Sequence, residues 1–142
     1  MPSMNADPLH PAGRYSGPAR FFHWTIALLI IVVWPVGLLI DATADIAWLN
    51  TLLYFIHENL GVTIWLLALA RLAWRFIHPP PPLPESLPAH MRAAAHATHV
   101  ALYVILLVQP IGGFITTNAF GFPLDWFGIL PLPSPVGENE AL

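Results

Sequence analysis

Histidine is the residue type in this chain that is best suited to chemistry. The 142 residues contain seven histidines and no cysteine. The absence of cysteine excludes covalent c-type haem attachment, thiolate-ligated iron–sulfur clusters, disulfides and zinc–thiolate sites. Imidazole is therefore the one good ligand for a transition metal or for haem iron that the chain offers in quantity. Two of the histidines, His23 and His57, lie within long apolar segments.

The composition indicates which elements position these histidines. Hydrophobic residues make up 56% of the chain and charged residues 9%, which is too apolar for a soluble domain of this size and fits one small membrane domain. All five basic residues are arginines and the net charge is −3, so the chain has no basic patch for nucleic acid. We expect an all-α integral membrane protein, an up-down bundle whose partner is the lipid bilayer.

The first predicted span covers residues 21–40, a run of twenty residues without a charge. About twenty apolar residues cross the hydrocarbon layer as a helix. A secretory signal peptide is the alternative, and residues 42–44 even resemble a cleavage site. The run is longer than the about 7 to 15 residues of a signal core, and further spans follow it.

The second predicted span covers residues 51–76 and contains His57. Its uninterrupted apolar run, residues 60–70, reaches only about 17 Å of a roughly 30 Å layer, so the helix must extend at one end. Extension backwards buries His57 and Glu58, whereas extension forwards buries Arg71 and Arg75. Extension backwards costs less free energy, because a neutral imidazole costs less to bury than two guanidiniums. His57 is thus an intramembrane histidine, which indicates a functional site by default.

The third predicted span covers residues 93–117, after a proline run at residues 79–82 that ends the second helix. We interpret residues 1–19 as an N-terminal arm and residues 20–142 as the transmembrane domain. Within that domain, residues 118–142 are aromatic and apolar but too interrupted by proline for a span. We expect them to form a loop in the outer interface.

The arginines predict the orientation of the bundle. Arg14 and Arg20 flank the N-terminal arm, and Arg71, Arg75 and Arg92 flank the loop between the second and third spans. The positive-inside rule then places the N terminus and the proline-rich loop in the cytoplasm. His23, His96 and His99 are expected at the cytoplasmic end and His57 near the opposite end. We expect the other three histidines, His10, His78 and His90, on the solvent side.

The depths of the histidines can be compared with what a b-type haem requires. Two imidazoles must approach one iron from opposite faces at the same depth. His23 and His57 differ in depth by roughly 15 to 20 Å, so they cannot share an iron. This suggests two haems, one near each surface. On depth alone His96 or His99, which share a helix face, could face His23, but no other histidine lies at the depth of His57.

Four motifs carry a resemblance to a known family. Their order and spacing over about residues 14–135 resemble the prokaryotic cytochrome b561 family, which is related to the haem-b subunits of hydrogenases and formate dehydrogenases. The motifs are Arg20-Phe-Phe-His23-Trp24; His57-x-x-x-Gly61 followed by Arg71, Arg75 and the prolines; Ala95-His96-x-x-His99-x-x-x-Tyr103 leading to Pro110-x-x-Gly113; and Trp126-Phe127-Gly128.

The resemblance implies four transmembrane helices in the bacterial inner membrane, two b haems, and electron exchange between a donor and a ubiquinone-type quinone. As an enzyme, such a protein would be a quinone-linked oxidoreductase. A dehydrogenase or an identical subunit is the implied protein partner. His23 and His57 would each be an axial ligand of one haem, and both partner histidines would come from the fourth helix. His96 and His99 would lie near a haem propionate or a quinone.

The fourth helix of the family pattern is not found in these 142 residues. We expect a truncated product or a fragment of a longer gene; the alternatives are a partner chain that supplies the helix and a haem-free remnant.

Each site also has an alternative without haem. His23 could be an interfacial histidine at a helix start. His96 and His99 could equally form a polar helix start bonded to the proline-rich loop. Arg71 and Arg75 are topology anchors or partners of haem propionates. With the same histidines, a non-redox membrane protein for metal transport or subunit interaction is the alternative function.

Overall fold

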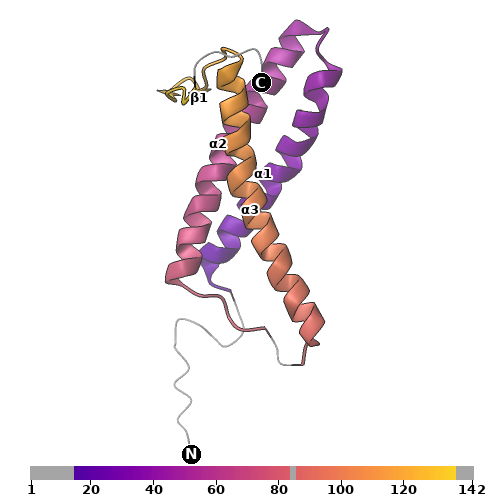
Figure 1. Cartoon of the computed structure of the whole chain (residues 1–142), viewed down its shortest axis with the longest axis vertical. Helices are drawn as coiled ribbons and strands as arrows, with labels where there is room; N and C mark the ends of the chain where they lie inside the picture. The colour runs from indigo at the N-terminus through magenta and orange to yellow at the C-terminus, as the bar shows by residue number, and fades with distance from the viewer. Residues whose placement is uncertain (1–14, 84–85, 137–142) are drawn as a thin grey trace, which may run out of the picture.

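The computed structural model describes residues 15–83 and 86–136 of the chain. They form three consecutive helices that run up, down and up, followed by a small antiparallel hairpin (Figure 1). Each helix is long and apolar enough to cross a membrane, which confirms the predicted all-α membrane bundle. The elements are α1 (Gly17–Ala42), α2 (Ala47–Ile77), α3 (Ala89–Ala119), β1 (Asp125–Trp126) and β2 (Leu130–Pro131).

The first helix begins earlier than the sequence suggested. The predicted arm ended at residue 19, but α1 already begins at Gly17 because Ser16 caps it and accepts a hydrogen bond from the Ala19 amide. Pro18 also suits the first turn, where its missing N–H has no helical partner. Residues 1–14, which include His10 and Arg14, lie outside the described residues.

The other two helices extend beyond their predicted spans at both ends. Each has 31 residues, or about 46 Å at 1.5 Å per residue, which exceeds a hydrocarbon layer of about 30 Å. Helices of this length that run along the membrane normal extend beyond the hydrocarbon layer. Helix α2 ends at Ile77 with His78 as its C-cap, and the proline run begins at the next residue, so the helix ends where the sequence predicted within one residue.

Helix α2 is the centre of the packing. Within the described residues, α1 packs on one face of α2 and α3 on another, and α1 and α3 do not contact each other as helices. Leu53, Ile64 and Ala68 are buried at 8%, 4% and 0% exposure. The spacing of a single helix face is followed by residues 53, 57, 60, 64, 68 and 71. His57 and Arg71 both contact α1, so they belong to the face of α2 that packs against α1.

The segment after α3 is more ordered than the predicted interfacial loop. The structure describes it up to residue 136, and it contains the hairpin, in which Trp126 pairs with Leu130. Gly128 adopts φ +68° in the turn, a conformation that favours glycine. The segment folds back onto α2: the Phe127 amide donates to Asn59 Oδ1, and Trp126 Nε1 donates to Thr63 Oγ1 at 3.2 Å. The remaining residues, 137–142, lie outside the described part.

Candidate functional site

His23 and Arg71 form a direct contact between α1 and α2. Arg71 Nη1 lies 2.8 Å from His23 Nδ1, and Arg71 Nε donates to the Tyr103 hydroxyl of α3 at 3.2 Å. The guanidinium also lies over the Tyr103 ring, 5.9 Å from its centroid. Arg71 therefore links all three helices at the end of the molecule where α1 and α3 begin and α2 ends. We call this the arginine end.

The contact defines the protonation of His23 in this structure. A guanidinium has only donors, so Nδ1 must accept and a neutral ring carries its proton on Nε2. Iron binding through Nε2 requires the opposite tautomer, with the proton on Nδ1. Arg71 must therefore leave the ring before Nε2 can bind iron.

An apolar groove opens beside His23 between α1 and α3. It has a volume of about 310 Å³, and the fully buried Ala68 of α2 lies at its base. The groove lies between α1 and α3, whose described backbones do not pack directly against each other. Its walls include Ile26, Ile30, Leu102, Tyr103 and Leu106.

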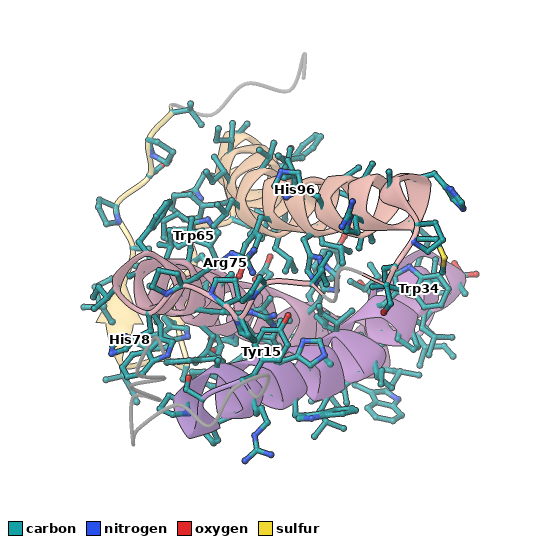
Figure 2. The ribbon with its side chains drawn as sticks, turned by 90° about the horizontal axis from the view of Figure 1, so that it is seen from below. Tyr15, Trp34, Trp65, Arg75, His78 and His96 are labelled. Carbon is teal, nitrogen blue, oxygen red and sulfur yellow. The ribbon has the colours of Figure 1, made fainter. Side chains whose placement is uncertain are left out.

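A second cavity, which we call the basic cleft, adjoins the groove at the arginine end. It has a volume of about 180 Å³ and shares His23, Arg71, His99 and Tyr103 with the groove. None of the acidic residues that the structure describes lines it. Figure 2 looks from below onto this end and labels Tyr15, Arg75 and His78, which all line the cleft. Its other lining residues include Arg20 and Trp74.

The two histidines of α3 that the sequence grouped together share one depression but differ in what else they reach. His96 and His99 both line this depression, together with Leu72 and Arg75. His99 also lines the groove and the basic cleft beside His23. His99 Nδ1 bonds to the Ala95 carbonyl of its own helix at 2.7 Å, not to the proline-rich loop. Both side chains are exposed.

His57 lies apart from this cluster, on the same face of α2 but fourteen residues earlier. That spacing corresponds to about 21 Å along the helix axis. Its Nδ1 lies 3.2 Å from the Val33 carbonyl of α1, and since a carbonyl only accepts, Nδ1 must donate and Nε2 keeps a free lone pair. The ring packs against Gly37, where an added Cβ would lie 2.7 Å from His57 Cε1. Histidines that bind metals typically have this tautomer, and a hydrogen bond from the other ring nitrogen fixes the orientation of the ring, as here.

The neighbours of His57 along α2 point to other elements. Glu58 is half-buried and lies beside Thr117 of α3, and Asn59 is almost fully buried and holds the hairpin segment. The remaining described histidines, at positions 78 and 90, lie at the arginine end. Among the described residues, no second histidine lies at the level of His57.

Sequence reasoning missed three parts of these sites. His78 was expected on the solvent side, but it is half-buried and its ring stacks on Trp74 at 4.0 Å between centroids. The roles of Gly37 and of the Val33 carbonyl were also missed, because contacts between helices do not appear in hydropathy. The one available signal was Gly37 itself, the single glycine within the first apolar run. The described residues contain no group of three or more His, Asp or Glu side chains that could hold a metal ion.

Comparison with known proteins assigns the family. The prokaryotic cytochrome b561 family matches residues 14–140. Cytochrome b561 homolog 2 of Escherichia coli (strain K12) is 31% identical over 138 residues, which cover 90% of this chain and 68% of the relative. Cytochrome b561 homolog 1 of the same organism is 24% identical over 131 residues, which cover 91% and 74%. The chain therefore belongs to the prokaryotic cytochrome b561 family, whose members are haem b electron carriers of bacterial membranes.

Proposed function

We propose that this protein carries electrons between a donor and the quinone pool through two b haems, one held by His23 and the other by His57. The observation that carries the proposal is the apolar groove beside His23 and its direct connection to the basic cleft. A b haem has an apolar ring system and anionic propionates, so it needs this combination of an apolar slot and nearby arginines. The haem, when bound, supplies reversible one-electron chemistry.

At the arginine end, His23 and Arg71 would act together. His23 is the proposed iron ligand, and Arg71 must leave its ring for Nε2 to bind. The released guanidinium stays near the site through its bond to the Tyr103 hydroxyl. It is then available to pair with a propionate in a charge-assisted hydrogen bond. A single movement of Arg71 would thus free His23 to bind iron and make the guanidinium available to a propionate.

At the other end, His57 needs no rearrangement of this kind. Its Nδ1 proton already bonds to the Val33 carbonyl, which fixes the ring and raises the basicity of Nε2. A second ligand for the iron at this level is proposed to come from another subunit. An identical subunit or a dehydrogenase partner would fit this requirement.

The exchange of electrons with quinone is proposed for the arginine end. His96 lies in a depression that is mostly apolar and next to Arg75, which suits a ring with polar oxygens and an isoprenoid tail. Under the positive-inside rule this end faces the cytoplasm. The alternative hypotheses, metal transport and a non-redox interaction subunit, receive no specific support from the described residues.

The test is a reduced-minus-oxidised visible spectrum of the full chain purified from membranes, together with its haem content. We expect a b-type alpha band after dithionite reduction. His23→Ala and His57→Ala should each remove about half of the haem, whereas His90→Ala, in the first turn of α3, should remove none. A spectrum without any dithionite-reducible band would contradict the proposal, and equal haem loss in all three variants would contradict the assigned ligands.

A further inference from the structure

The part of the basic cleft farthest from the groove contains cationic and polar groups that the proposed haem ligation does not use. Arg20, Trp74, Arg75 and His78 line the cleft but not the groove. We propose that this region binds the phosphate group of an anionic phospholipid. The proposal does not depend on the haem or its ligands.

The charge of the region is uncompensated among the described residues. Arg20 and Arg75 line it, and Arg71 lies at its boundary with the groove. The described acidic side chains all lie elsewhere: Asp41 is at the end of α1, Asp45 in the α1–α2 connection, Glu58 beside Thr117, and Asp125 in the hairpin. Arginines that have no counter-charge among the described residues favour binding of an anion, and a guanidinium can contact two phosphate oxygens at once.

His78 gives a second, independent indication. Its Nδ1 is buried and has no hydrogen-bond partner. Such groups are rare in folded proteins because a buried unpaired polar atom costs stability. The ring is held in place: it stacks on Trp74, whose Nε1 donates to Ser16 Oγ at 3.1 Å. In the tautomer with a proton on Nδ1, this atom is a donor without an acceptor. Because protein atoms cover Nδ1 in the empty cleft, the proposal includes a rotation of the ring toward the cleft, after which a phosphate oxygen supplies the acceptor.

The position of the cleft favours a lipid as the source of the phosphate. It lies where α1 begins and α2 ends, at the level at which the long helices leave the hydrocarbon layer. Basic pockets between membrane helices on the cytoplasmic side bind acidic lipid headgroups. The whole cleft, including the part that it shares with the groove, has a volume of about 180 Å³. The region thus combines positive charge with a position at the end of the membrane helices.

The experiment measures lipid retention by the full chain. The protein is reconstituted in phosphatidylcholine nanodiscs with and without phosphatidylglycerol, extracted in mild detergent, and examined by native mass spectrometry. We expect one phosphatidylglycerol per chain. Arg20→Gln and Arg75→Gln should each weaken retention about fivefold, which corresponds to about 1 kcal/mol per arginine. His78→Phe keeps a ring that can stack on Trp74 but removes Nδ1, and should weaken retention to a smaller extent.

Arg92→Gln is the matched control, because Arg92 is exposed in the first turns of α3, has the same charge and does not line the cleft. Equal loss in Arg92→Gln would reveal unspecific attraction to the membrane and overturn the proposal. Displacement of the lipid by millimolar inorganic phosphate would overturn the lipid as the source. Loss of the lipid upon loading with haem would assign the cleft to the propionates instead.

Circular dichroism of each variant identifies any that does not fold. If Arg75→Gln does not fold, Arg75→Lys replaces it. Lysine keeps the charge but not the fork of donors, so lipid retention by Arg75→Lys should be intermediate.

Discussion

His57 is held in one orientation by two contacts with α1. Its Nδ1 bonds to the Val33 carbonyl and its ring lies against Gly37. At Gly37 even the smallest side chain would overlap the imidazole, since its Cβ would lie 2.7 Å from Cε1 and 3.0 Å from Nδ1. The glycine is therefore part of the proposed haem site although it cannot bind a ligand itself.

This contact makes Gly37→Ala informative. The ring must move away from α1, which lengthens the bond to Val33 and releases the tautomer that keeps Nε2 free. We expect loss of about half of the haem, the share bound at His57, and a destabilisation of about 1 to 3 kcal/mol from overpacking. Haem content and thermal unfolding measure the two effects. The control is Gly112→Ala in α3, where an added Cβ meets no atom within 4 Å. Normal haem content in Gly37→Ala would contradict the role of this contact.

Arg71 has two proposed partners, the His23 ring without haem and a propionate with it. Arg71→Gln removes the guanidinium that can pair with the propionate. A charge-assisted hydrogen bond contributes about 1.5 to 3 kcal/mol, so we expect haem at the arginine end to dissociate at least about tenfold faster. Transfer of haem from the purified protein to apomyoglobin measures the rate. Arg92→Gln removes the same charge at the same end and should leave the rate unchanged; a similar acceleration in both variants would argue against a specific pairing.

At the scale of elements, the hairpin segment is attached to α2 by polar contacts. Asn59 has two roles: its Oδ1 accepts from the Phe127 amide, and its Nδ2 donates to the Phe55 carbonyl at 2.7 Å. Thr63 accepts from Trp126 one turn further along. Phe55 and Phe127 also meet edge to face, with ring centroids 6.2 Å apart. The segment therefore packs on a face of α2 that neither α1 nor α3 covers.

Asn59→Leu tests this attachment. The change leaves the part-buried Phe127 amide without its acceptor, and the loss of such a bond costs about 0.5 to 1.5 kcal/mol. We expect hydrogen exchange at that amide to become roughly 2- to 12-fold faster, since 1.4 kcal/mol corresponds to a factor of ten. The control is Asn50→Leu, which instead removes a 2.7 Å bond to the Ile40 carbonyl near the α1–α2 connection. Unchanged exchange at Phe127 in Asn59→Leu would mean that other contacts hold the segment.

The spans and their order could be predicted from the sequence because they depend on local properties. The uncharged run at residues 21–40 and the prolines after α2 define where helices can lie, whatever surrounds them. The start of α1 at Gly17 was missed by a few residues because it depends on the Ser16 cap. The hairpin was missed because two-residue strands are too short to show an alternating pattern.

The contacts of the candidate site depend on how the helices face each other, which hydropathy does not contain. The sequence predicted His23 and His57 as separate sites from their depth alone. It did not pair Arg71 with His23, or His57 with Gly37, because these pairs are 48 and 20 residues apart and meet only when α1 packs on α2.

At the scale of the whole molecule, charge is distributed unequally between the two ends. The arginine end holds Arg20, Arg71, Arg75 and Arg92, whereas the opposite end holds Asp41 in the last turn of α1 and Asp45 in the α1–α2 connection. Both proposals for the arginine end, quinone exchange and lipid binding, assume that this end faces the cytoplasm. Basic residues in short loops are retained on that side during membrane insertion.

The orientation can be measured directly because the chain contains no cysteine. Ala44→Cys places a thiol in the exposed α1–α2 connection, and Ser86→Cys places one in the exposed α2–α3 connection. A membrane-impermeant maleimide added to intact spheroplasts should label the first variant within minutes, and the second only after the membrane is opened. Labelling of both variants by a permeant maleimide controls for thiol reactivity. The reverse pattern would place the arginine end outside, because a single inversion exchanges the sides of both connections. It would also move the proposed quinone and lipid sites to the outer leaflet.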